Sequence, residues 1–550
     1  MELQLPERKK PAHNNFNTIP EAVKRWVDDL PLLNTELTRQ LLGKALNEVN
    51  SLHIPTEHRY AALELMATSV LCVTDALRKQ FLGKALPLQE GEMNAAVEAL
   101  EICNSMATGY RILADDLGRK PYQDTQLATA LHRSLRYLSE LLLIHYQIYI
   151  QYPDNLWKSI HALYALAEEC GITLLPVSDP TAATEETSTI ATIYKQILLL
   201  SLACPYRMPQ KEIHYVYNAL LDWARFCRLV PASAERAGGL FMLDQQSDSP
   251  PTYRSPSAVR RADKHVRILD TSAATRQLRA VLSSDNVPGA NHTGIGSTDT
   301  LQQLMLAWGA MPKRRYPRYR GHASIKLVSG VNAIHGLIAD PGAGAHEDDD
   351  AIMDHHYLPD PTFDSRTNLT IPPERADRLL RGAYSTDPEP GPRIELWHMA
   401  DTSAGGYCLL WDNAVASNAR VGELVAIVQQ DESSAGSWQL GVNRWMKFTS
   451  ERGLELGVQL LAPSGEAVWA YACNDEFRLD PRADKRMQGI LLPEIRVLGQ
   501  EPSLLLPSLP FRAGCAAILE RNGHRQNIVL TRQTENTGCF AQFQFTPAGS

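Results

Sequence analysis

The sequence predicts a multidomain α+β protein, with an all-α N-terminal region followed by β-rich segments. Two patterns lead to this prediction. From about residue 19 to 228, apolar residues recur three and four positions apart, whereas short segments after about residue 320 alternate apolar and polar residues. A chain of 550 residues also exceeds what one ordinary hydrophobic core supports, so two or three domains are expected.

The N-terminal region, residues 1–243, is expected to form a helical bundle or a repeat-like helical domain. Asp154 and Asn155 are candidate caps for one helix, which Gly171 would end. No clean 34-residue repeat signature is present, so bundle and repeat array both stay open. The clearest helical stripe, interpreted as core, consists of Leu127, Leu131, Leu135, Leu138, Leu142, Tyr146 and Tyr149.

Residues 244–310 are expected to be a linker with a short mixed region and a lead-in helix. The stretch 244–262, DQQSDSPPTYRSPSAVRRA, is rich in Ser, Pro and charge, as linkers are. After it, VRILD is typical of a strand, and residues 272–284 and 299–310 have helical spacing. The last of these helices runs directly into a basic cluster.

Composition limits the partners and the compartment. A net charge of -8 and a pI near 6.1 give no overall electrostatic reason to bind a nucleic acid polymer. The nine cysteines are scattered and contain no Cys-x-x-Cys pair, which favours reduced thiols over a disulfide frame. The N-terminus is polar and the longest apolar runs are short or interrupted. We therefore expect a cytoplasmic protein without a membrane span.

The basic cluster, KRRYPRYR at residues 313–320, places five positive charges within eight residues of an acidic protein. Pro317 is incompatible with a regular helix here, so the arginines are expected on an irregular connector. The planar fork of arginine bonds phosphate oxygens in pairs, and its flat face stacks on purines. The segment ASIKLVSG that follows alternates like a strand.

A second motif lies about eighty residues later, in RIELWHMADTSAGGYCLLW, which predicts a strand, a tight turn and another strand. Asp401 and Ser403 in the turn offer a carboxylate and a hydroxyl to a base edge. Gly405 and Gly406 allow the positive φ and the close approach that such a turn needs.

Taken together, the two motifs make residues 311–480 resemble a PilZ domain. Arg314-x-x-x-Arg318 matches the R-x-x-x-R element of that family, and Asp401-x-Ser403-x-x-Gly406 matches its [DN]-x-S-x-x-G element, in the family's order. The later segment GSWQLGVNRWMKFTSERGLELGVQLL is similar to the two closing strands of PilZ barrels. Each motif alone also occurs as a solvated basic surface or a generic hairpin turn.

The resemblance implies a six-stranded antiparallel β-barrel and cyclic di-GMP as its ligand. Arg314 and Arg318 would grip guanine and phosphate, and Arg315 would be a further phosphate partner. Asp401 and Ser403 would hydrogen-bond a guanine, while Gly406 would keep the turn open. The chain departs from the family pattern by an insertion at residues 340–392 and by Asn443 at a usually apolar position.

The insertion raises a separate alternative, a metal-dependent enzyme. Its acidic and histidine residues, including Asp354, His355 and His356, are of the type that binds divalent ions. No recognised ligand spacing organises them, and the chain contains no P-loop, H-E-x-x-H or G-x-S-x-G motif. We therefore expect no enzyme activity, no metal and no cofactor.

Residues 481–550 contain several short alternating segments, including GILLPEIRVLGQ and CFAQFQF. They predict a small β-rich extension, either packed on the barrel or forming a degenerate second one. The extension lacks a second arginine pair with a second D-x-S-x-x-G, so a role in protein contact is expected.

The expected function is a bacterial cyclic di-GMP receptor. Ligand binding at the PilZ-like barrel would change how the helical domain meets a protein partner, in motility, biofilm or exopolysaccharide control as the family implies. A second alternative is a PilZ-like interaction scaffold that no longer binds nucleotide.

Overall fold

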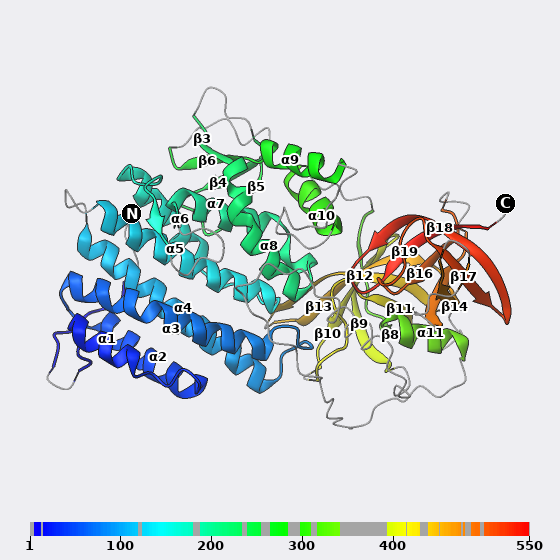
Figure 1. Cartoon of the computed structure of the whole chain (residues 1–550), viewed down its shortest axis with the longest axis horizontal. Helices are drawn as coiled ribbons and strands as arrows, with labels where there is room; N and C mark the ends of the chain where they lie inside the picture. Colours follow the sequence, from blue (N-terminus) through cyan, green and yellow to red (C-terminus); the bar gives the residue numbers. More distant parts are fainter. Residues whose placement is uncertain are drawn as a thin grey trace. The chain divides into compact units, whose positions relative to one another are not determined.

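The computed structural model divides the chain into two compact units, residues 1–84 with 88–313 and residues 85–87 with 314–550. The first unit is mainly helical and the second is built from strands, so the predicted fold class is confirmed (Figure 1). The structure describes residues 5–12, 15–118, 124–179, 187–233, 239–254, 264–283, 298–309, 316–340, 393–413, 415–429, 438–449, 451–474, 477–478, 486–494 and 500–548.

The helical unit is organised around α5, whose side chains are buried along most of its length. All seven members of the predicted stripe are buried, and α5 packs against α4, α6, α7 and α8. Side-chain caps mark the start of two of these helices. The Asn34 side chain accepts the Leu37 N–H at 3.1 Å at the start of α2, and the Thr189 side chain accepts the Thr192 N–H at 3.1 Å at the start of α7. The helices are α1 (Pro20–Asp28), α2 (Thr35–Ser51), α3 (Thr56–Phe81), α4 (Glu90–Leu117), α5 (Asp124–Gln147), α6 (Leu156–Glu169), α7 (Ile190–Leu202), α8 (Gln210–Trp223), α9 (Ser272–Ser283) and α10 (Thr298–Gly309).

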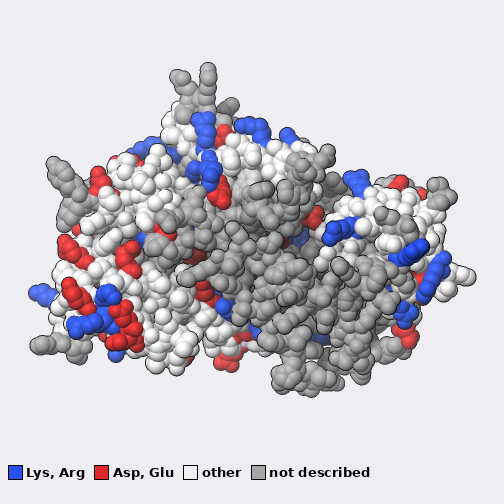
Figure 2. Space-filling model, in the orientation of Figure 1, with Lys and Arg blue, Asp and Glu red and all other residues white. Residues whose placement is uncertain are grey.

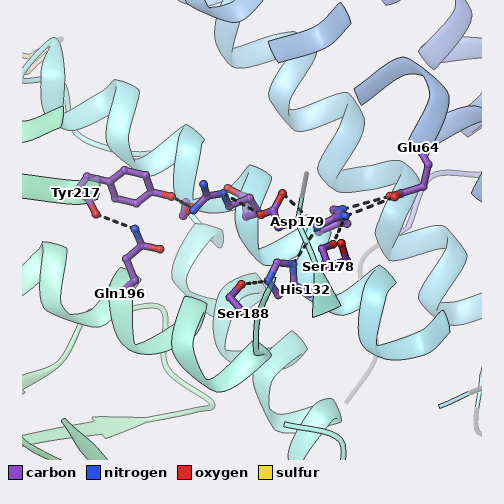
Figure 3. A network of polar contacts seen from close by, with 10 residues as sticks. Glu64, His132, Ser178, Asp179, Ser188, Gln196 and Tyr217 are labelled. Carbon is purple, nitrogen blue, oxygen red and sulfur yellow. Dashed lines mark hydrogen bonds and ion pairs between the residues drawn. The ribbon is translucent and has the colours of Figure 1, made fainter. Parts of the chain in front are cut away.

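A polar network runs through the interior of the helical unit (Figure 3). Arg133 of α5 donates to Glu64 of α3 at 3.2 Å and to the carbonyl oxygen of Ser178 at 2.7 Å. His132 Nε2 lies 2.7 Å from Ser188 Oγ, and burial lowers the pKa of this histidine to about 3, so it is neutral. These bonds tie the two-stranded ribbon of β1 (Val177–Ser178) and β2 (Thr187–Ser188) to α5. The network also includes Asp179, Gln196 and Tyr217.

Residues 244–254 of the expected linker fold within the helical unit, which corrects the prediction for this part of the chain. The VRILD strand and the two helices predicted after it are found as expected. A four-stranded antiparallel sheet forms there, because VRILD, which follows the Ser- and Pro-rich stretch, pairs with two strands that come before it, Arg228–Pro231 and Phe241–Asp244. Thr252–Tyr253, within the stretch, adds the edge strand by pairing with Phe241–Asp244. Asp248, inside that stretch, accepts the backbone N–H groups of Asn155 and Lys158 at 2.6 and 3.0 Å. The side chain of Asn155 makes no cap bond, so Asp248 rather than the predicted residues caps α6. The strands, in sheet order, are β3 (Arg228–Pro231), β6 (Val266–Asp270), β4 (Phe241–Asp244) and β5 (Thr252–Tyr253).

One described helix, α3, is long and apolar enough to cross a membrane by composition, and half of its apolar window is buried inside the protein. Acidic and basic side chains are interspersed on the helical part of the face in Figure 2. Within the helical unit, some charged side chains pair along one helix, as in Lys24–Asp28 at 2.8 Å and Arg39–Glu36 at 2.7 Å.

The second unit contains a closed six-stranded antiparallel barrel, as the family resemblance implies. The ring closes because β9 and β10 pair with each other as well as with their outer neighbours. The short strand β7 (Tyr319–Arg320) lies beside β9, and the helix α11 (Val331–Ala339) follows β8. In ring order the strands are β8 (Ser324–Ser329), β9 (Glu395–Ser403), β10 (Gly406–Trp411), β13 (Gly453–Ala462), β12 (Gln439–Thr449) and β11 (Leu424–Gln429).

The C-terminal part is a second closed barrel, which starts before the predicted boundary at residue 480. Its first strand is β14, which follows β13 after three residues and pairs with later strands instead of with the first barrel. Numbered in chain order, the strands of both barrels close in the order 1-2-3-6-5-4. In ring order the strands are β14 (Glu466–Ala472), β15 (Met487–Leu492), β16 (Ser503–Leu506), β19 (Ala541–Pro547), β18 (His524–Asn536) and β17 (Ala516–Arg521).

The two barrels share an apolar core. Outward-facing residues of β15 and β16, such as Ile490 and Leu505, are fully buried in one cluster with Leu424 and Val442 of the first barrel. Helix α11 contributes Ile334 to the same cluster. At the edge of this interface, Arg444 of β12 pairs with Glu535 of β18, with Nη2 and Oε2 at 3.0 Å. The barrels are therefore joined by a buried surface and an ion pair rather than by a linker alone.

Candidate ligand-binding site

The predicted turn is the hairpin between β9 and β10. Ser403 pairs with Gly406, and only Ala404 and Gly405 lie between them. The register shifts within the hairpin: Cys408 lies opposite Asp401 but Leu409 lies opposite Met399, so Ala400 is a bulge residue. A bulge turns the end of a strand away from the ladder. Here it re-aims the last four residues of β9, which include both polar residues of the motif.

Gly406 is required at its position by space as well as by backbone conformation. Its φ is +149°, and a Cβ built there would lie 1.9 Å from the carbonyl oxygen of Val458 on β13. Backbone cannot move aside as the end of a side chain can, so a larger residue would separate β10 from β13. The last glycine of the motif therefore keeps the turn closely packed on the barrel.

Ser403 organises the turn through its hydroxyl. The hydroxyl accepts the N–H of Gly405 and donates to the carbonyl oxygen of Gly406, each at 3.3 Å. A hydroxyl that bonds local backbone in this way stabilises the tight conformation.

The described part of the arginine connector lies along the end of β9. Tyr319 pairs with Thr402 and Arg320 with Asp401, and the N–H of Gly321 donates to the carbonyl oxygen of the bulge residue Ala400 at 3.2 Å. This pairing adds a short strand to the hairpin. The described part of the connector is therefore in direct contact with the second motif.

Arg318 and Asp401 join the two motifs directly. Arg318 Nη1 donates to Asp401 Oδ2 at 3.1 Å, across 83 positions of sequence. The two side chains are 42% and 26% exposed, so both still face solvent. A partly exposed pair of this kind is held weakly and can exchange partners.

The interior beneath the site is apolar. Cys408, opposite Asp401, is buried, and burial together with the Asp401 charge raises the pKa of its thiol to about 12. A thiol with so high a pKa is a poor nucleophile at neutral pH. Cys408 therefore belongs to the packing under the turn.

Four of the six predicted site residues are brought together: Arg318, Asp401, Ser403 and Gly406. The other two, Arg314 and Arg315, lie outside the described residues, as does nearly all of the insertion with its acidic and histidine residues. Among the residues that the structure does describe, none form a group of three or more side chains placed to hold a metal ion.

Asn443, the other departure from the family pattern, is fully buried and ties a loop to the barrel. Its side-chain amide donates to the carbonyl oxygen of Arg420 at 2.8 Å, and its backbone N–H bonds the carbonyl oxygen of Glu423. Its side-chain oxygen has no described partner. The polar residue is thus a structural adaptation of this chain that holds the segment before β11.

Tyr316 is a site residue that the sequence reasoning did not single out. Its ring lies against the turn, since a Cβ built on Gly405 would be 3.1 Å from Tyr316 Cδ2. Its position between the arginines of the R-x-x-x-R element was the available signal, because any residue there must lie near what the arginines contact.

Comparison with known protein families gives three consecutive matches. Residues 21–233 match the model described as the N-terminal domain of the cyclic-di-GMP receptor FimW. Residues 240–343 and 381–466 match its middle PilZ domain, and residues 478–548 match its C-terminal β-barrel domain. The break in the middle match, residues 344–380, falls inside the insertion recognised from the sequence.

A full-length relative supports the same assignment. The chain is 26% identical to the cyclic-di-GMP receptor FimW of Pseudomonas aeruginosa, over 100% of this chain and 94% of that protein. No solved structure matches the chain. Because three domain models match in order and the barrel carries both motifs, the chain belongs to the PilZ-domain family, together with the cyclic-di-GMP receptor FimW.

Proposed function

We propose that this protein is a cyclic di-GMP receptor that binds its ligand at the β9–β10 hairpin of the first barrel. The observation that carries the proposal is the 3.1 Å bond between Arg318 and Asp401, which unites two motifs that are far apart in sequence. Ser403 and Gly406 supply the turn beneath them, and Arg314 and Arg315 complete the set of ligand-binding residues.

The chemistry of these residues suits a guanine dinucleotide. The Watson–Crick edge of guanine carries N–H donors, which a carboxylate such as that of Asp401 accepts. Guanine O6 and N7, like phosphate oxygens, accept paired bonds from arginine. A ring of two nucleotides joined by two phosphates therefore satisfies an arginine cluster and a carboxylate at once.

Binding requires Arg318 and Asp401 to release each other at least in part. Because the pair is exposed, its opening costs no more than about 1 kcal/mol. A ligand that offers phosphate to Arg318 and guanine to Asp401 replaces one exposed bond by several charge-assisted ones. The bond between Arg318 and Asp401 is therefore one that a ligand replaces well only when it offers both phosphate and guanine.

The wider role is a receptor without catalytic activity, acting in the cytoplasm on a protein partner through its helical unit. The full-length similarity to a protein named as a cyclic-di-GMP receptor supports the ligand. Motility, biofilm formation and exopolysaccharide production are the processes in which such a receptor would act. A bound nucleotide would shift the helical unit from one partner-binding state to another. The size of this shift would be set by the difference between the affinities of the two states for the nucleotide.

Calorimetric titration of the whole protein with cyclic di-GMP tests the proposal. We expect saturable binding that the Arg314→Ala/Arg318→Ala double variant loses, and no comparable heat with GTP. If the folded wild-type protein gives no binding heat, the receptor function is wrong and the scaffold alternative takes its place.

A further inference from the structure

We propose that Tyr316 is the residue on which a guanine base of the ligand stacks. This inference rests on the proposed function and deepens it. It names the residue that contacts the face of the guanine base, whereas Asp401 would bond the edge of the base and Arg318 the phosphates. It is carried by the position of the Tyr316 ring, by its exposure and by the backbone that fixes it.

The ring of Tyr316 contacts the turn of the second motif. A Cβ added to Gly405 would lie 3.1 Å from Cδ2 and 3.3 Å from Cε2 of Tyr316, closer than ordinary van der Waals contact. One edge of the ring therefore rests on the glycine. Gly405 leaves room for the ring, and a side chain at this position would push it away.

The backbone at Tyr316 is restrained from its C-terminal side, which limits where the ring can lie. Pro317 restricts the conformation of the residue before it. Two residues further on, β7 pairs with Thr402 and Asp401 of β9. A ring held in this way loses little freedom when it meets a ligand, which favours binding.

Tyr316 is 47% exposed although its ring edge touches the turn. Part of the ring is therefore open to solvent next to the polar residues of the site. Aromatic rings and purines stack favourably through their faces, and an accessible tyrosine beside hydrogen-bonding groups is a usual means of holding a nucleobase.

The Tyr316 ring and the Asp401 carboxylate both lie at the β9–β10 hairpin, the ring against Gly405 and the carboxylate near the end of β9. Asp401 lies opposite Cys408 and Gly405 follows four residues after it, so the two groups flank one hairpin end. A guanine whose edge bonds Asp401 therefore lies over the turn, where the Tyr316 ring stands. Arg318, bonded to Asp401, remains beside it for the phosphates.

Two substitutions separate stacking from simple packing. Tyr316→Phe keeps the aromatic face and removes the hydroxyl, whereas Tyr316→Leu keeps an apolar side chain against Gly405 and removes the aromatic face. Tyr215→Leu on α8, a tyrosine that is 40% exposed in the other unit, is the matched control. All are made in the full-length protein and titrated with cyclic di-GMP.

We expect Tyr316→Leu to weaken binding by about 5- to 100-fold, because loss of one base–aromatic stack costs that much affinity. Tyr316→Phe and Tyr215→Leu should bind like the wild type. In proton NMR spectra of the bound ligand, the guanine H8 signal should move upfield with the wild type and with Tyr316→Phe, and not with Tyr316→Leu. This ring-current shift does not arise from a merely structural role.

The outcomes distinguish this inference from the proposed function. If the wild type and Tyr316→Leu bind equally well and give the same H8 shift, the stacking role is overturned and the receptor function stands. If Tyr316→Phe fails together with Tyr316→Leu, the hydroxyl rather than the ring face matters, and stacking is again overturned. If the wild type does not bind, both proposals fall.

Discussion

The two barrels of this protein have the same strand order but use the same strands for different purposes. In the first barrel, the second and third strands, β9 and β10, carry the Asp401–Gly406 turn and the connector beside it. In the second barrel, the second and third strands, β15 and β16, present Ile490, Leu492 and Leu505 to the shared apolar core. Equivalent strands thus form the proposed ligand site in one barrel and an intramolecular interface in the other.

The difference lies in what precedes and joins these strands. A connector leads into β8 and pairs with β9 before the first barrel begins. By contrast, β14 follows β13 after residues 463–465, which leaves no length for such a connector. The turn between β9 and β10 has two residues, whereas residues 493–502 join β15 to β16. A common fold therefore does not carry a common function, because the connections carry it.

The largest expected effect tests whether the barrels are one structural unit. Leu505→Asp places a charge in the buried cluster between them, and we expect the free energy of unfolding to fall by about 4 kcal/mol or more. Leu509→Asp, at a residue of the same barrel that is 57% exposed, should change it little. Equal effects of the two substitutions in denaturant titrations would show that the barrels are not joined through this cluster.

A second substitution compares glycines of the two barrels. Gly406→Ala should destabilise the protein by about 2 to 4 kcal/mol for two reasons. The new Cβ would collide with the carbonyl oxygen of Val458, and alanine would have to adopt an unfavourable positive φ. Gly514→Ala in the second barrel has a φ of +87° but open space around it, so only the conformational cost remains, about 1 kcal/mol. Thermal and denaturant unfolding of both variants measures the difference. If both cost the same, the close approach at Gly406 is not what selects glycine.

A third comparison sets an arginine of the site against one of the second barrel. Arg318→Ala should weaken cyclic di-GMP binding by about 10- to 100-fold, the loss of charge-assisted bonds, with a stability change below about 1 kcal/mol. Arg525→Ala removes an ion pair with Glu520, 2.8 Å apart, and should leave binding unchanged. Calorimetry on both variants checks this. If Arg525→Ala weakened binding and Arg318→Ala did not, the ligand site would lie on the second barrel instead of the first.

The smallest expected effect is a pH dependence of stability that arises in the helical unit and not in the barrels. Burial lowers the pKa of His132 from 6.5 to about 3 in the folded protein. As pH falls, this histidine is therefore protonated in the unfolded chain before it is protonated in the folded protein. The free energy of unfolding keeps its full value above about pH 6.5. It falls by about 1.4 kcal/mol for each pH unit as pH drops from there towards 3. Denaturant unfolding at pH 7 and pH 5.5 should show this loss in the wild type and less of it in His132→Gln. The same loss in both would assign the pH dependence to other groups, such as His214, whose pKa burial lowers to about 4.

The sequence predicted the elements whose signal is local. Helical stripes, the alternation of β9 and β10 and the two closing strands each reflect the period of a single segment, and all are found where they were expected. The β9–β10 turn was equally predictable, because its two glycines and the Asp and Ser before them fall within six residues.

Long-range features escaped the sequence. The cap of α6 comes from Asp248, about ninety residues away. The apparent linker contributes the edge strand β5, which is held in a sheet by its pairing with β4. The assignment of β14 to the second barrel depends on its pairing with β15 and β17, which no local pattern records. The contact of the Tyr316 ring with Gly405 likewise appears only when the connector lies on the hairpin.

The most direct test of the account is hydrogen–deuterium exchange of the full-length protein with and without cyclic di-GMP. We expect the ligand to slow exchange in peptides covering residues 316–321 and 401–406 of the first barrel, and to leave exchange in residues 486–506 of the second barrel unchanged. Ligand-dependent protection confined to the second barrel would contradict the account, and so would protection confined to the helical unit.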